Sequence, residues 1–297
     1  MHLRRQPSPG IARASTSRRQ ALARTISLVS AAILACGHGD QSTGAPTSPQ
    51  STTNSTPTTP APVAPTWNTA TQGIPKFIAF NYIDLTQLDK AGRPLIWAIS
   101  KFRSSTGHAY GDRDEPCVSK KHYFMVPDST TRIYAPLTGK VVHRDAGPSR
   151  LATGYDAFEL QPDGYPAFYV TIFHVILDKE WKVGDQITAG TLLGHHTSKP
   201  TYSDISVAYD DGGAAQGTDY NQAAKALISY FDVMADSVFR QFQVRGIATR
   251  ADLQISKEER ATWPLTCILG SDAFNQLDSW WPDKLATTVS VLKPATR

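Results

Sequence analysis

Short runs of apolar residues, separated by turn residues, dominate the middle of the chain. These runs are rich in Ile, Val, Phe and Tyr and are bounded by Gly, Pro and Asp, which is typical of β-strands. They are KFIAFNYIDL (76–85), PLIWAISKF (94–102), RIYAPLTGKVVHRD (132–145), DAFELQP (156–162), AFYVTIFHVI (167–176), QITAGTLLG (186–194) and SDISVAY (203–209). Strands at this spacing predict a mainly β domain over residues 74–217, built as an antiparallel sandwich or barrel.

The pattern changes toward the C-terminus, where apolar residues recur at three- and four-residue steps. This period predicts one amphipathic helix over Asn221–Gln243, ended by Gly246. Its apolar stripe consists of Ala223, Leu227, Phe231, Met234, Val238 and Phe242. A second, short helix is expected near Thr249 or Asp252, since both residue types favour the N-cap position. Residues 218–297 are therefore predicted to form a helical C-terminal extension.

The first 36 residues have the pattern of an export signal. Arginines precede the apolar run 26–35, which is far shorter than the ~20 apolar residues of a membrane-spanning helix. The tetrapeptide Ile33–Cys36 resembles a bacterial lipobox, which implies that Cys36 carries a lipid. The alternative is an incidental thiol in a cleaved signal peptide. In both cases we expect an exported protein, and with the lipid a membrane-anchored lipoprotein that faces the periplasm or the cell exterior.

Residues 37–73 form a Ser/Thr/Pro-rich segment, as in STGAPTSPQSTTNSTPTTPAPVAPT. Such a composition offers too little apolar surface to offset the entropy lost on ordering, so we predict a disordered linker. It could act as a tether between a lipid anchor and the folded domain. A tail with no spatial role is the alternative.

Charge and common motifs exclude several function classes. The formal net charge is +4, and several of the arginines lie near the N-terminus. The remainder of the chain is nearly balanced, so charge gives no argument for nucleic-acid binding. The G-x-G-x-x-G and G-x-S-x-G patterns are absent, and no serine stands beside a predicted base.

Two cysteines remain after the export signal, Cys117 and Cys267. In an exported chain two such thiols are expected to form a disulfide. The bond would fasten the C-terminal extension to the loop that precedes His122. Two buried free thiols are the alternative, because the sequence does not show that the two residues meet.

Four segments, in order, resemble lysostaphin-type (LytM-like) murein zinc endopeptidases. IYAPLTGKVV matches the family's V-x-A-P-x-x-G-x-V hairpin, and FYVTIFHVI matches the strand that carries a catalytic His. WKVGDQITAGTLLG matches V-x-x-G-D-x-V-x-A-G-Q-x-I-G, and SDISVAY stands in the place of H-L-H-F-E. The resemblance covers residues 107–210. It implies a lysostaphin-like fold (duplicated hybrid motif) and peptidoglycan as the associated polymer.

The resemblance also implies which positions would carry chemistry. The family holds zinc with the His and Asp of an HxxxD motif and the second His of HxH, and leaves one position for an acidified water. Two further histidines act as acid/base groups or stabilise developing charge. Carried over, these two catalytic positions fall on His174 and Asp204. Ser206 stands at the third zinc-ligand position, and its hydroxyl is a poor zinc ligand.

The HxxxD motif has two candidate matches, so zinc is a candidate cofactor. His108 and Asp112 have the right spacing, whereas His122 lies at nearly the right distance from the hairpin but has Val126 where the Asp is expected. We take His108, Asp112 and His122 as candidate metal ligands, in a set that suits other divalent metals too. The adjacent His195–His196 are expected on the surface.

Each candidate has a purely structural alternative. His174 lies in an apolar strand, where a lone histidine is often a core residue with satisfied hydrogen bonds. His108 and Asp112 could simply bond loop backbone, and His122 could be an exposed strand residue. Asp204 could be a strand-edge carboxylate.

Three functions follow from these residues. Without a histidine at Ser206 the family's zinc site is incomplete, so the first is a non-catalytic binding or regulatory module at the cell envelope. Its partners would be peptidoglycan or an envelope protein, and the membrane through a lipid anchor. The alternative is a zinc-dependent murein endopeptidase with a rearranged metal site. A third is an unrelated carbohydrate- or lipid-binding β domain.

Overall fold

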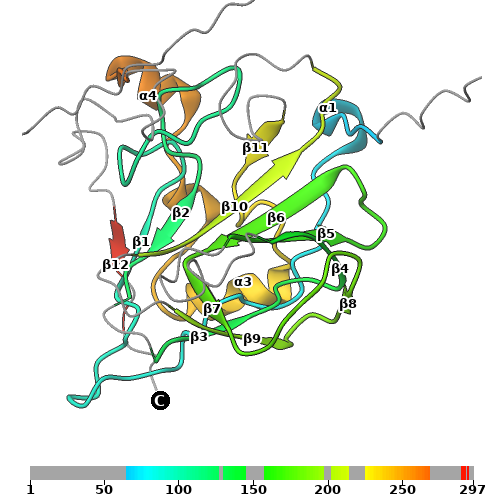
Figure 1. Cartoon of the computed structure of the whole chain (residues 1–297). Coiled ribbons are helices and arrows are strands. Elements are labelled where there is room, and N and C mark those ends of the chain that lie inside the picture. The colour runs from blue at the N-terminus through cyan, green and yellow to red at the C-terminus, as the bar shows by residue number, and fades with distance from the viewer. Residues whose placement is uncertain are drawn as a thin grey trace, which may run out of the picture. The chain divides into compact units, whose positions relative to one another are not determined.

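The computed structural model describes residues 65–126, 130–144, 157–196, 202–213, 225–267, 289–291 and 293 (Figure 1). The predicted signal, Cys36 and residues 37–64 of the predicted linker lie outside the described residues. The end of that linker, residues 65–73, is ordered, since Thr69–Gln72 form a short helix and Trp67 packs against the core. Within the described part, no helix is long and apolar enough to cross a membrane.

The larger of two sheets has nine strands, and all its pairings are antiparallel (Figure 1). Eight strands follow the order β12-β1-β2-β10-β6-β5-β4-β8, and β11 also pairs with β10. The strands are β1 (Ala98–Ser100), β2 (His122–Phe124), β4 (Gly139–Arg144), β5 (Ala157–Pro162), β6 (Phe168–Phe173), β8 (Gln186–Ile187), β10 (Ser203–Tyr209), β11 (Ala226–Ile228) and β12 (Val289–Val291). The predicted mainly β, antiparallel fold is confirmed.

The smaller sheet has the order β3-β9-β7. Its strands are β3 (Arg132–Tyr134), β7 (Val175–Leu177) and β9 (Leu192–His196). The predicted strand–turn–strand after residue 131 therefore joins two different sheets, because β3 pairs with β9 whereas β4 pairs with β5 and β8. His196 is only 1% exposed in β9, which contradicts the surface position expected for it.

Strand β10 separates apolar from polar side chains by its two-residue period. Ile205 and Val207 are fully buried in the hydrophobic core, together with Val170 and Ile172 of the neighbouring β6. The side chains of Asp204 and Ser206 lie on the opposite face of the same strand. This alternation was predicted from SDISVAY, and it brings the two residues to one face of the sheet.

The predicted continuous helix over Asn221–Gln243 is wrong for residues 226–235, whereas 221–224 lie outside the described residues. Residues 226–228 form β11, which pairs with β10 through Leu227↔Ala208, and the helix α3 begins only at Asp236 (Asp236–Gln243). The stripe residues that the structure describes, Leu227, Phe231, Met234, Val238 and Phe242, are buried all the same. Hydrogen bonding to the exposed side of β10 has therefore overridden the helical period. The described residues also form the short helices α1 (Thr69–Gln72), η1 (Arg250–Leu253) and α4 (Lys257–Thr262).

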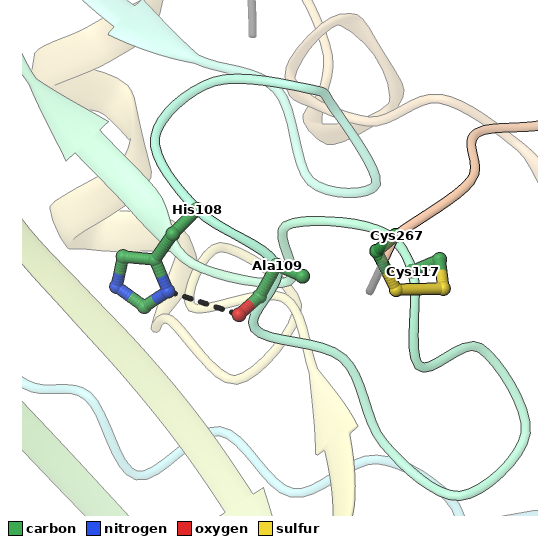
Figure 2. Close-up of a disulfide and its surroundings, with 4 residues drawn as sticks. All are labelled: His108, Ala109, Cys117 and Cys267. Carbon is green, nitrogen blue, oxygen red and sulfur yellow. Dashed lines mark hydrogen bonds between the residues drawn. A yellow bond between two sulfur atoms is a disulfide. The ribbon is translucent and has the colours of Figure 1, made fainter. Parts of the chain in front are cut away.

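The predicted disulfide between Cys117 and Cys267 is confirmed (Figure 2). It joins the long connection between β1 and β2 to the segment that follows α4. The helical content of the C-terminal region is small. Its residues Tyr230, Phe231 and Phe242 share the hydrophobic core with the strands.

Candidate functional site

The site begins with the polar residues of β10 and their neighbours on β6. Asp204 lies opposite Phe173 and Ser206 lies opposite Thr171 in the strand register. Paired residues of adjacent strands point to the same face of a sheet, so these four side chains form one surface. Asp204 and Ser206 are nonetheless almost completely buried, with 0% and 2% exposed. Something from outside the two strands must therefore cover them.

The ammonium of Lys121 covers the carboxylate of Asp204. Lys121 Nζ lies 2.8 Å from Asp204 Oδ2, and the two side chains are 3% and 1% exposed. The same ammonium lies over two aromatic rings, 3.5 Å from the centroid of Phe173 and 4.1 Å from that of Tyr110. Burial lowers the pKa of Lys121, and the adjacent Asp204 opposes that shift. The pair is a buried cation–carboxylate contact with aromatic walls.

His174 contacts the second oxygen of Asp204. His174 Nε2 lies 3.2 Å from Asp204 Oδ1, and the imidazole is 20% exposed. Its backbone has φ 59°, a left-handed conformation that is uncommon for a residue other than glycine. The structure thus brings together the two residues predicted as catalytic. A strained backbone at such a residue is a pointer to function that only the structure provides.

Tyr110 covers Ser206. The two hydroxyl oxygens are 3.0 Å apart, and the Tyr110 ring packs edge-on against Phe173 with centroids 5.7 Å apart. Burial raises the pKa of Tyr110, so its hydroxyl stays protonated and can hydrogen-bond as a neutral group. The residue at the predicted third zinc-ligand position is therefore engaged by a tyrosine.

His108 lies beside this cluster. Its Nδ1 is 2.9 Å from the carbonyl oxygen of Ala109 (Figure 2). Burial, followed by the charge of Lys121, lowers the pKa of His108 to about 4. Asp204 and His174 also influence it, in opposite directions. His108 is therefore a neutral imidazole at pH 7, within electrostatic reach of the Lys121–Asp204 pair.

Asp112, the other half of the predicted HxxxD motif, has different partners. Its Oδ1 accepts from Lys120 Nζ at 2.6 Å, and its Oδ2 accepts from the backbone N–H of Leu227 at 3.0 Å. Both oxygens therefore stabilise the connection between β1 and β2 and its contact with β11. This use of the carboxylate matches the structural alternative considered for Asp112.

His122 lies on the other face of the sheet. It pairs with Ile205 in the register of β2 and β10, and Ile205 belongs to the hydrophobic core. His122 Nδ1 is 3.0 Å from the carbonyl oxygen of Ser100, and Nε2 is 2.8 Å from Ser229 Oγ. Burial lowers the pKa of His122 to about 4. The structure does not bring His122 together with His174 and Asp204, and it contradicts the alternative of an exposed strand residue.

The donors around Asp204 do not fit a zinc ion in this arrangement. Zinc in proteins is held by three or four His, Cys, Asp or Glu ligands. Within the described residues no group of three or more such side chains is placed to hold a metal. The carboxylate of Asp204 already meets an ammonium, and the hydroxyl of Ser206 meets Tyr110. A divalent cation would have to displace Lys121, since two cations cannot share this contact at low cost.

Lys121 and Tyr110 were not predicted from the sequence. A lysine in the stretch VSKKHYF reads as a surface charge, and Tyr110 lies in a Gly-rich loop. The only sequence signal is the alternation in β2, which places residue 121 on the same side as Tyr123. Tyr123 pairs with Asp204.

Comparisons with solved structures return lysostaphin, a zinc-containing peptidase and an M23 metalloprotease. The peptidase lysostaphin from Staphylococcus simulans is 15% identical, with 41% of this chain and 47% of that chain covered and a TM-score of 0.28. A zinc-containing peptidase from Vibrio cholerae is 14% identical, with 52% and 46% covered and a TM-score of 0.28. The deep-sea M23 metalloprotease pseudoalterin is 11% identical, with 52% and 73% covered and a TM-score of 0.28.

No protein-family model and no curated protein matches the chain. The chain spans about half the length of the lysostaphin structures, 52% and 47% of two of them. These neighbours are of the same class as the family that the sequence motifs resemble. At such TM-scores and identities they carry no argument about the site, so the inferences below rest on the residues themselves.

Proposed function

We propose that this protein is a lysostaphin-like module of the cell envelope that binds peptidoglycan or an envelope protein without cutting it. The observation that carries the proposal is the buried contact between Lys121 and Asp204. It lies where the resemblance assigns catalytic and zinc-binding positions. An internal ammonium occupies the place beside the carboxylate that a metal cation would take.

An ammonium cannot replace zinc chemically. It offers one positive charge and three hydrogen-bond donors, but no open coordination position. Zinc, when bound, supplies a water acidified toward neutral pH and a Lewis acid for the scissile carbonyl. Lys121 supplies neither, and Ser206 cannot restore the ligand set. The cluster is therefore suited to holding the sheet together rather than to hydrolysis.

Binding would use the more open part of the same sheet face. Glu159 is partly exposed and continues the row of Ser206 and Thr171, and the partly exposed Tyr169 lies on the same face, opposite Ala208. Glu159 Oε2 accepts from Thr171 Oγ1 at 3.0 Å, and Lys225 Nζ lies 3.3 Å from the centroid of the Tyr169 ring. A carboxylate, an ammonium and an aromatic ring together suit a peptide that carries both charges, such as a wall peptide.

The location is part of the same proposal. Residues 1–36 would direct export, Cys36 would carry the lipid, and residues 37–64 would hold the domain away from the membrane. Incorporation of a radioactive fatty acid into the parent chain, but not into the Cys36→Ser variant, would support this anchor. Equal labelling of both forms would contradict it.

The first test is the zinc content of the full chain after dialysis in the absence of chelator, together with digestion of purified peptidoglycan. We expect no stoichiometric zinc, no release of wall peptides, and co-sedimentation of the protein with peptidoglycan. About one zinc per chain with release of peptides would sink the proposal, since one ion is what a catalytic site of this type holds. Glu159→Gln should weaken the co-sedimentation, whereas a change at the exposed Lys182 should not.

A zinc endopeptidase with rearranged ligands is the second candidate. It is favoured by the contact of His174 Nε2 with Asp204 Oδ1 at 3.2 Å, which places two side chains of zinc-ligand type together. The partly buried imidazole of His108 would be the third. On this alternative, His108→Ala and His174→Ala would each abolish zinc binding and peptide release.

A further inference from the structure

The connection between β1 and β2 is much longer than the strands require. The two strands are antiparallel neighbours through Ile99↔Phe124, so a turn of roughly two to five residues could join them. Instead the chain runs from 101 to 121 before β2 begins. Long connections inside a compact domain are usually functional. Residues 103–119 are called the cover segment below.

The cover segment lies on the polar face of β10 and β6. It supplies Tyr110, whose hydroxyl meets Ser206 and whose ring meets Phe173. Tyr110 also belongs to a small apolar cluster with Ala208 and Leu227. Lys121 is not part of the cover segment, because it directly precedes β2. Removal of the cover segment would therefore uncover Ser206 but leave the contact between Lys121 and Asp204 in place.

Most ion pairs of the cover segment are internal or lie at its two ends. Glu115 pairs with Arg103 at 2.8 Å and with Lys120 at 2.7 Å, so the segment holds its own shape. Arg103 has φ 64°, a left-handed conformation at the point where the segment leaves β1. A segment with its own fixed shape can move as a unit once its outside attachments open, and these are the disulfide, Arg113–Asp211 at 2.7 Å and the contact of Asp112 with the Leu227 N–H.

The disulfide cross-links the cover segment to the C-terminal region of the domain. Cys117 lies in the segment and Cys267 follows α4 (Figure 2). Both cysteines are partly exposed. Cys117 also lines a cavity of about 250 Å³ whose wall includes Lys257 and Arg260. A small thiol or thiolate can therefore approach the disulfide from solvent.

We propose that the Cys117–Cys267 disulfide is a redox-controlled latch that keeps the cover segment closed over the polar face of the sheet. A thiolate of a dithiol reductant attacks one cysteine sulfur, the S–S bond breaks, and the other sulfur leaves and takes a proton. The second thiol of the reductant then resolves the mixed disulfide. The reductant is oxidised to a disulfide, and the two cysteines become thiols. The latch itself does not depend on the proposed function; only the identity of what the uncovered face binds rests on it.

Hydrogen exchange of the full chain, with and without dithiothreitol under native conditions, tests the latch. We expect exchange in peptides covering 103–119 to become about tenfold faster or more after reduction, because the disulfide then no longer restrains local opening of the segment. Peptides covering 157–173, which contain β5 and β6, should not change. Unchanged exchange in 103–119 would overturn the proposal. So would equal acceleration in both regions, since the disulfide would then support the whole domain.

Two variants complete the test. Cys117→Ser should show the fast exchange in the absence of reductant and no further response to it. Cys36→Ser, the matched control for the third cysteine, should behave like the parent chain. If Cys117→Ser does not fold, the comparison of the parent chain with and without dithiothreitol still decides. Binding to peptidoglycan is read separately: no binding in either redox state contradicts the proposed function, whereas binding that ignores reduction contradicts only the latch.

Discussion

The two faces of the sheet around β10 are both buried, but they are stabilised in opposite ways. On the core face, Ile205 and Val207 pack among apolar side chains, and their neighbour His122 is neutral. On the other face, Asp204 is a carboxylate that meets the ammonium of Lys121. Neutral and apolar burial tolerates the loss of single contacts, whereas burial of a charge depends on its partner. The second face should therefore be the more fragile one.

Removing the ammonium should give the largest effect. Lys121→Met leaves the carboxylate of Asp204 buried beside only a histidine, so we expect the free energy of unfolding to fall by about 3–5 kcal/mol. Urea denaturation measures this loss. Lys90→Met, at an exposed lysine, should change it by less than about 0.5 kcal/mol.

The double variant sharpens the comparison. Lys121→Met/Asp204→Asn removes both charges, so it should be more stable than Lys121→Met alone. If Lys121→Met were as stable as the parent chain, the contact between Lys121 and Asp204 would not be what stabilises this buried face.

The core face should respond to pH through His122. Its pKa is about 4 in the folded protein and 6.5 in its ordinary environment. Below pH 6.5 the unfolded chain binds a proton that the folded chain excludes, so stability falls as pH falls toward 4. The full loss for one such histidine is about 3 kcal/mol. His108 has a similarly lowered pKa and adds to the slope.

Unfolding free energies measured between pH 7 and pH 4 check this prediction. His122→Gln keeps a hydrogen-bond donor and an acceptor but does not titrate, so the slope should become smaller. Thr188→Ala, at an exposed residue that does not titrate, should leave the slope unchanged. An identical slope in His122→Gln would show that burial does not lower the pKa of His122.

The smallest expected effect concerns the hydroxyl pair on the second face. Tyr110→Phe removes one partner of Ser206 and should cost about 1–2 kcal/mol of unfolding free energy, since a buried hydroxyl then lacks its bond. Tyr110→Phe/Ser206→Ala should recover part of that loss. Tyr202→Phe, at a tyrosine that is 42% exposed, should be neutral. A larger loss for Tyr202→Phe than for Tyr110→Phe would contradict this ranking.

Patterns in short stretches of sequence predicted the features that depend on neighbouring residues alone. Alternation in SDISVAY placed Asp204 and Ser206 on one face, and the two cysteines of an exported chain predicted the disulfide. The helix predicted over Asn221–Gln243 is wrong at 226–228, because the period of its apolar residues does not reveal that β10 offers an edge to β11. Pairing with a distant strand is decided by the assembled sheet.

The candidate site was harder to predict for the same reason. Lys121 and Asp204 are separated by 83 residues, and neither carries a local signal for the other. His122 and Lys121 are neighbours in sequence but lie on opposite faces of the sheet. The motif match that made His122 a candidate metal ligand therefore selected a residue on the face opposite to Asp204. Alternation along β2 places Lys121 and His122 on opposite faces, and the register of β2 against β10 shows which face holds Asp204.

Strand β12 has a practical consequence for handling the protein. It contributes the outermost strand beside β1, with Ala98↔Val291 to Ser100↔Val289 as its register. A chain shortened before residue 289 would present the backbone N–H and C=O groups of β1 to solvent. Exposed sheet edges of this kind recruit strands from other molecules, so shortened preparations should self-associate and precipitate. Affinity tags and reporter fusions are therefore better placed ahead of the folded domain than behind it.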